Sequence, residues 1–184
     1  MCSIAGIISK KGKNVSSRIV EMLAMLKHRG PHSAGVAIDN EAAVSKEPTL
    51  LNISDKEGTM AIGYTGLSIN AHLDLQPFID CKGQLLVVHD GEIYNSEEIR
   101  RDLASHTFET AYDSETIVHL IEEKFQSDLG KTLPRLLPQL DGSYALAVMQ
   151  GDRIAIARDP VGVKPLYWGE NQEFFAFASE RKAM

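Results

Sequence analysis

The chain has 184 residues, of which 43% are hydrophobic and 24% charged, as in an ordinary globular domain. Nineteen Lys and Arg against 25 Asp and Glu give a formal charge of -6, and this acidic balance argues against a nucleic-acid partner. Two cysteines, Cys2 and Cys81, are too few for a disulfide framework or an all-cysteine zinc site.

No segment of the sequence is typical of a membrane or secretory protein. The longest stretch without a charged residue, 59–73, contains glycines and is too short for a membrane-spanning helix. The first residues lack the basic and apolar regions of a signal peptide. We therefore expect a cytoplasmic protein with neither a membrane partner nor a nucleic-acid partner.

The spacing of apolar residues predicts strands near both ends of the chain and helices between them. In chain order, the predicted elements are a strand at 4–9, a helix at 15–26, strands at 34–39, 60–69 and 85–89, helices at 99–103, 117–125 and 129–137, and strands at 143–149, 153–158, 166–168 and 174–178. Residues 150–152, Gln-Gly-Asp, predict a hairpin turn. This order indicates a single α/β or α+β domain whose sheets pack against helices.

Most patterns that mark catalytic or metal sites are absent. The sequence has no HExxH, GxGxxG or GxSxG motif. Its six histidines show no paired metal-ligand spacing, so we expect no metal site and assign them structural or solvated roles.

Cys2 is the candidate nucleophile because of its position. If Met1 is removed, the thiol and a free α-amine lie on one residue. Such an amine has a pKa of about 7.7–8.0, so it can act as a general base for its own thiol. The alternative is a small buried residue at the start of a strand.

The residues around Cys2 carry a family resemblance. Met1 to Ile7, Met-Cys-Ser-Ile-Ala-Gly-Ile, resembles the start of the class II glutamine amidotransferases. Further blocks that resemble this family follow in its order at 28–35, 89–95, 113–115, 158–167 and 178–180. The last two blocks resemble the asparagine synthetase branch.

The resemblance implies the fold and the extent of the domain. It implies an α+β fold, the four-layer αββα sandwich of N-terminal-nucleophile hydrolases, with two mostly antiparallel sheets between helix layers. It also implies that residues 1–184 form one amidotransferase-like domain, the N-terminal part of a longer asparagine synthetase-like chain.

The resemblance also assigns roles to particular residues. Cys2 attacks the glutamine carboxamide, and Asp90 and Gly91 stand where the family places its oxyanion donors. Asp113 matches the residue that binds the α-ammonium group, although it could instead be a helix N-cap. The expected substrate-binding residues are Gly66, Leu67, Ser68, Ile69, Gly91, Glu92 and Asp113.

Two of these positions depart from the family pattern. Gly66 stands where the family has the arginine that binds the substrate carboxylate, so the bidentate contact is lost. Asp90 replaces the oxyanion-hole asparagine, and an ionised carboxylate only accepts hydrogen bonds. The pair Arg158–Asp159 belongs to the block at 158–167, but it could also be a surface pair that follows a strand.

The expected function is a glutaminase domain that supplies ammonia for amide transfer to aspartate or a related acceptor, with activity weakened or lost because of Gly66 and Asp90. Its expected partners are glutamine and a C-terminal synthetase domain or subunit. We expect no cofactor in this domain, because the Ser-Gly-Gly-type pyrophosphate loop is absent and ATP and magnesium would belong to the synthetase part. The alternatives are a non-catalytic structural or regulatory module of an ammonia-dependent synthetase, and a stand-alone ligand-binding protein.

Overall fold

Two antiparallel sheets form the centre of the computed structural model, which describes residues 2–45, 53, 55–68, 75–126 and 128–184. The first sheet has six strands in the order β3-β2-β4-β1-β10-β9, and the second has four in the order β5-β6-β7-β8. Their bounds are β1 Ser3–Ser9, β2 Ser33–Ile38, β3 Glu41–Ser45, β4 Met60–Gly66, β5 Phe78–Ile79, β6 Leu86–Ile93, β7 Gly142–Gln150, β8 Arg153–Arg158, β9 Tyr167–Glu170 and β10 Phe174–Ala178. All paired neighbours are antiparallel, as predicted.

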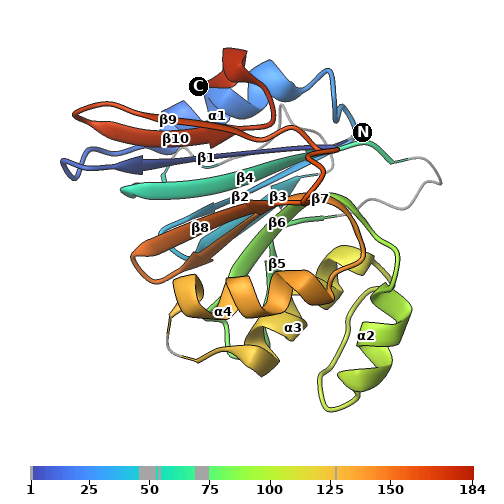
Figure 1. The fold of residues 1–184 in the computed structure, drawn as a ribbon. Helices are drawn as coiled ribbons and strands as arrows, with labels where there is room; N and C mark the ends of the chain where they lie inside the picture. The colour runs from blue at the N-terminus through green and yellow to red at the C-terminus, as the bar shows by residue number, and fades with distance from the viewer. Residues whose placement is uncertain (1, 46–52, 54, 69–74, 127) are drawn as a thin grey trace.

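Helices cover the outer faces of the two sheets. Helix α1 lies on the six-stranded sheet, and α2, α3 and α4 lie on the four-stranded one (Figure 1). Their bounds are α1 Ser16–Leu26, α2 Ser96–Asp102, α3 Asp113–Lys124 and α4 Leu129–Leu136. The layer order is therefore αββα, which confirms the expected architecture.

Alternation along the strands explains the layers. In β4, Met60, Ile62 and Tyr64 point into the core between the sheets, whereas Ala61 between them packs toward α1. In β7 the small residues Ala145 and Ala147 face the other sheet. A period of two gives each sheet two buried faces, so the strands are apolar on both sides.

Helix α1 follows from the sequence pattern that predicts it. Ile19, Met22, Leu23 and Leu26 recur at helical spacing, and all four are buried against the sheet. No helix in the described ranges is long and apolar enough to span a membrane.

The differences from the predicted elements lie at sheet edges and element ends. The edge strands β3 and β5 are not predicted, because β3 has no fully buried residue and β5 has only two residues. Strand β6 continues to Ile93, beyond the predicted end at His89. The predicted hairpin joins β7 to β8, and Gly151 at its turn has a φ of +55°.

The backbone at Gly35 packs closely against the backbone at Gln76, and a substitution can test this packing. A Cβ at Gly35 would overlap the carbonyl oxygen of Gln76, so we expect Gly35→Ala to cost about 1–3 kcal/mol or more in unfolding free energy. In the control Gly169→Ala, the new Cβ would meet only the flexible end of Met184, at 3.1 Å. Urea unfolding should show a change within about 0.5 kcal/mol for that control. Equal stability of the two variants would contradict the close packing of Gly35.

Candidate active site

Cys2 directly precedes β1, and the start of this strand is held on two sides. The Ser3 and Thr65 hydroxyls are 2.6 Å apart and hydrogen-bonded. The N–H of Ile4 donates to Ser179 Oγ at 2.9 Å, and the N–H of Ser179 donates to the Ile4 carbonyl at 2.9 Å. These bonds fix the backbone that carries Cys2.

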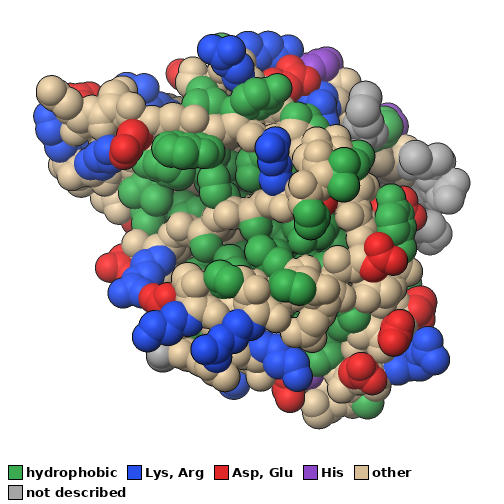
Figure 2. Space-filling model, viewed as in Figure 1, with side chains coloured by type: hydrophobic (Ala, Val, Ile, Leu, Met, Phe, Trp, Pro, Cys, Tyr) green, Lys and Arg blue, Asp and Glu red, His purple; other side chains and the backbone are tan. Residues whose placement is uncertain are grey.

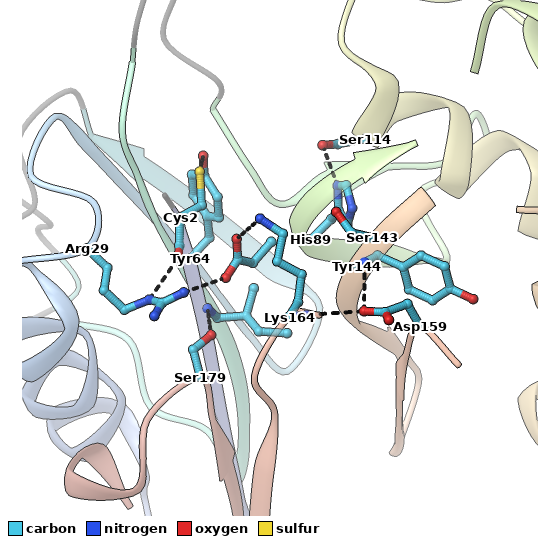
Figure 3. Close-up of polar contacts among 12 residues, drawn as sticks. Cys2, Arg29, Tyr64, His89, Ser114, Ser143, Tyr144, Asp159, Lys164 and Ser179 are labelled. Atoms are coloured by element: carbon cyan, nitrogen blue, oxygen red, sulfur yellow. Dashed lines mark hydrogen bonds and ion pairs between the residues drawn. The ribbon is translucent and has the colours of Figure 1, made fainter. Parts of the chain in front are cut away.

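The Cys2 thiol has a hydroxyl neighbour that the sequence analysis did not identify. Tyr64 donates a hydrogen bond to Cys2 Sγ at 3.2 Å, and its own side chain is buried (Figure 3). Gly66 leaves room for this arrangement, since a Cβ there would lie 2.5 Å from the Tyr64 hydroxyl oxygen and would overlap Ser33 Oγ. An arginine at position 66 therefore requires Tyr64 and Ser33 to move.

Arg29 connects Cys2 with the predicted oxyanion residue. Its Nε donates to the Cys2 carbonyl at 3.0 Å, and its Nη2 donates to Asp90 Oδ2 at 3.1 Å. Lys164 Nζ lies 3.5 Å from the other carboxylate oxygen of Asp90, and Asp90 is only 1% exposed. The guanidinium of Arg29 thus contacts both the predicted nucleophile residue and Asp90, and Lys164 is a second cation beside Asp90.

Asp159 shapes the loop that presents Lys164. Its carboxylate accepts the N–H groups of Tyr144, Val163 and Lys164 at 2.9–3.2 Å. Burial alone would raise the pKa of Asp159, but these N–H groups and that of Gly162 bring it below its ordinary value. Asp159 is 3% exposed, so its alternative assignment as a surface residue is wrong.

His89 lies directly before Asp90 and is fully buried. Its Nδ1 is hydrogen-bonded to Ser114 Oγ at 2.8 Å, and its Nε2 has no partner among the described residues. Burial lowers the pKa of His89 to about 4, although the charge of Asp90 acts in the opposite direction. A Cβ at Gly91 would lie 2.6 Å from Nε2, so a glycine permits this close approach.

Asp113 is the first residue of α3. Its Oδ2 accepts the N–H of Ile93 at 2.7 Å, which ties α3 to the end of β6. The helix N-cap position is Tyr112, whose side chain makes no capping hydrogen bond. Asp113 therefore lies one residue inside the position that the N-cap alternative assigns to it, and its carboxylate contacts the first N–H groups of the helix, those of Asp113 and Ser114. Burial raises the pKa of Asp113, while the N–H of Ile93 and the charge of Lys164 oppose the increase.

The remaining predicted substrate residues in the described ranges, Leu67, Ser68 and Glu92, take no part in the contacts described above. Leu67 is 36% exposed, and the N–H of Ser68 donates to His32 Nδ1 at 3.1 Å. Glu92 is exposed at the end of β6. Ile69 lies outside the described residues. Their assignment to glutamine binding stays a prediction.

Besides Tyr64, sequence reasoning missed Arg29 and Lys164 as partners of Asp90. Both belong to blocks that carry the family resemblance, at 28–35 and 158–167. Their proximity to Asp90 depends on two loops that meet only in the fold, and nothing in their sequence spacing indicates it.

The antiparallel sheets between helix layers, with a cysteine beside the first strand, define the fold of the N-terminal-nucleophile hydrolases. A solved structure has the same fold. It is a glutamine phosphoribosylpyrophosphate amidotransferase from B. subtilis, complexed with ADP and GMP. The match covers 99% of this chain and 42% of the solved chain, with a TM-score of 0.85 and 26% sequence identity. The chain belongs to the glutamine amidotransferase domain family, whose model matches residues 1–184.

Curated relatives carry this domain in longer chains. A Methanocaldococcus jannaschii protein with the provisional name asparagine synthetase [glutamine-hydrolyzing] 1 is 35% identical over 189 residues, which cover all of this chain and 33% of the relative. An amidophosphoribosyltransferase of the same organism is 32% identical over 202 residues, covering 100% of this chain and 43% of the relative. The chain therefore spans less than half the length of these relatives.

The buried His89 predicts a pH dependence of stability. Its folded pKa of about 4 lies below the unfolded value of about 6.5. Above pH 6.5 both states are neutral at this residue; as the pH falls from 6.5 to 4, the unfolded state binds a proton that the folded state does not. The shift corresponds to a loss of about 3 kcal/mol of unfolding free energy across this window.

The variant His89→Asn keeps a polar side chain near Ser114 without this titration. Chemical unfolding at several pH values should show a flatter curve for the variant between pH 6.5 and 4. Parallel curves for parent and variant would mean that His89 is not held neutral.

Proposed function

We propose that this domain hydrolyses glutamine to glutamate and ammonia with Cys2 as the nucleophile, at a rate that Asp90 and Gly66 reduce. The observation that carries the proposal is the position of Arg29, which contacts both the Cys2 carbonyl and Asp90. Arg29 thus links the residue that carries the thiol to the Asp90–Gly91 segment, and we infer that one substrate amide contacts both. The comparisons support the reaction class, because the family model is that of a glutamine amidotransferase domain and the first relative is named as glutamine-hydrolysing.

The proposed reaction has two steps. The Cys2 thiolate attacks the carboxamide carbon and forms a tetrahedral oxyanion, which collapses to a γ-glutamyl thioester and ammonia. Water then attacks the thioester, releasing glutamate and restoring the thiol. The Cys2 α-amine, once Met1 is removed, accepts the thiol proton and passes it to the leaving nitrogen, and in the second step it takes a proton from the attacking water and returns it to the thiolate.

The surroundings of Asp90 account for the reduced rate. A carboxylate between Arg29 and Lys164 offers only acceptor atoms to an oxyanion, so the donor expected at this position is missing. The Gly91 N–H remains as the second predicted donor. Loss of one oxyanion donor typically reduces the rate about 100- to 1000-fold.

We further propose that the ammonia acceptor is an asparagine-forming synthetase domain or subunit in the cytoplasm. The blocks at 158–167 and 178–180 and the first relative support this branch. Large apolar side chains are exposed at Val161, Val163, Tyr167 and Trp168, and Figure 2 shows apolar side chains gathered on this face. Such a patch suits a partner domain. ATP and magnesium would be used by that domain.

A second candidate is a non-catalytic module of an ammonia-dependent synthetase. The two ion pairs of Asp90 favour it, because they use the oxyanion residue as a structural link. Ammonia release from glutamine separates the two candidates. Release by the parent, with removal of Met1 verified by intact mass, and its loss in Cys2→Ala support the glutaminase; no release by the parent supports the module.

Asp90→Asn tests the role of the oxyanion position. The amide supplies a donor and releases Arg29 and Lys164 from their pairing, so we expect ammonia release to rise about 100- to 1000-fold. The same substitution in a Cys2→Ala background should show none of this gain. An unchanged rate in a folded Asp90→Asn protein would exclude Asp90 as the cause of slow turnover.

Glutamine affinity tests the effect of Gly66. Loss of a charge-assisted partner for the α-carboxylate costs about 1.5–3 kcal/mol, roughly ten- to a hundredfold in binding. Calorimetry on Cys2→Ala, which prevents turnover, should therefore give a millimolar dissociation constant. Asp113→Asn should weaken binding further, whereas the exposed Asp102→Asn should not. A micromolar constant would mean that another cation binds the carboxylate.

A further inference from the structure

A second cluster of reactive side chains lies on the helical side of the four-stranded sheet. It consists of Cys81, after β5, His106, after α2, and His119 and Glu122 on α3. One ligand atom from each residue, Cys81 Sγ, a ring nitrogen of each histidine and a carboxylate oxygen, lies within 4.8 Å of all the others. The sequence analysis expected no metal site, because these residues are paired only by the fold.

The separations fit the coordination shell of one metal ion. Cys81 Sγ lies 3.8 Å from His106 Nδ1 and 3.7 Å from His119 Nδ1. Glu122 Oε2 lies 3.3 Å from His106 Nδ1 and 3.4 Å from His119 Nδ1. Tetrahedral zinc, with bonds of about 2.3 Å to sulfur and about 2.0–2.1 Å to nitrogen or oxygen, places its ligand atoms about 3.6 Å and 3.3 Å apart.

The outer contacts of the histidines also fit metal ligation. The distal nitrogen of His106, Nε2, is 3.1 Å from Glu123 Oε2, and that of His119 is 3.8 Å from Glu115 Oε1. A carboxylate behind a ligating imidazole orients the ring and increases its basicity. Both Nδ1 atoms are then directed toward the centre of the cluster.

The remaining polar neighbours leave the ligand atoms in place. Lys82 Nζ pairs with Glu122 Oε1 at 3.6 Å, which is the oxygen that does not face the histidines. The backbone N–H of Cys81 donates to Glu122 Oε2 at 3.1 Å. Carboxylates that bind metals are themselves hydrogen-bonded in this way. The side chains of His106, His119 and Glu122 are at least 91% buried, whereas Cys81 is exposed, so the cluster lies at the surface with its cysteine on the solvent side.

We propose that Cys81, His106, His119 and Glu122 form a structural zinc site. Thiolate, imidazole and carboxylate ligands in this number suit zinc, and four protein ligands leave no position open for substrate. The ion joins the turn after β5 and the loop after α2 to α3. The proposal is independent of the glutaminase activity.

Cobalt(II) titration of the chelator-stripped protein tests the site directly. We expect one cobalt per chain, visible absorption typical of tetrahedral coordination, a near-ultraviolet sulfur-to-cobalt charge-transfer band, and displacement of cobalt by zinc. A free Cys2 amine and thiol could also chelate cobalt, so the titration is repeated in Cys2→Ala, where the signals should remain. Absence of stoichiometric binding or of the charge-transfer band in Cys2→Ala overturns the proposal.

Variants then locate the ligands. Cys81→Ser should lose the charge-transfer band, and zinc should raise the melting temperature of the parent but not of this variant. Glu123→Gln should weaken metal binding about 10- to 100-fold, whereas the exposed Glu97→Gln should leave it unchanged. A charge-transfer band retained in Cys81→Ser would place the metal elsewhere and overturn the proposal. If Cys81→Ser does not fold, the spectrum of Cys2→Ala decides.

Discussion

The buried carboxylate of Asp90 holds three separate segments together. Arg29 follows α1, Lys164 lies in the loop after β8, and Asp90 is part of β6. Removal of one partner from a buried ion pair costs several kcal/mol, because the other charge stays desolvated. Arg29 also donates to the Cys2 carbonyl, so the position of the predicted nucleophile depends on the same interaction. At this position a structural ion-pair link coincides with the residue that the family resemblance predicts for the oxyanion hole.

Gly66 and Tyr64 are also linked, because each constrains the other next to Cys2. Without a Cβ at position 66, the Tyr64 ring can place its hydroxyl 3.2 Å from the Cys2 sulfur. An arginine introduced at this position would therefore have to displace a tyrosine that is buried between the sheets. The two departures from the family pattern are each embedded in contacts with neighbours, so neither behaves as an isolated substitution.

The sequence predicts those parts of the structure whose cause is local. Helix α1 follows from the spacing of its buried residues, and the β7–β8 hairpin follows from the turn around Gly151. Strand β3 escapes prediction because an exposed edge strand needs no apolar alternation. The four-layer arrangement is implied only by the family resemblance. Local sequence patterns do not indicate it, because the strand order brings together segments as distant as β1 and β10. Contacts such as Arg29 with Asp90, or Cys81 with His119, depend on that arrangement and have no signature in sequence spacing.

Helix α3 connects the two chemically distinct regions of the domain. At its first residue, Asp113 accepts a hydrogen bond from the end of β6, close to the Asp90–Gly91 segment. In its last turns, His119 and Glu122 belong to the proposed zinc site. A helix of 12 residues is about 18 Å long and does not bend easily, so restraint at one end also limits movement at the other. The proposed metal would therefore stabilise the predicted ammonium-binding residue through the helix backbone, without contact with the substrate.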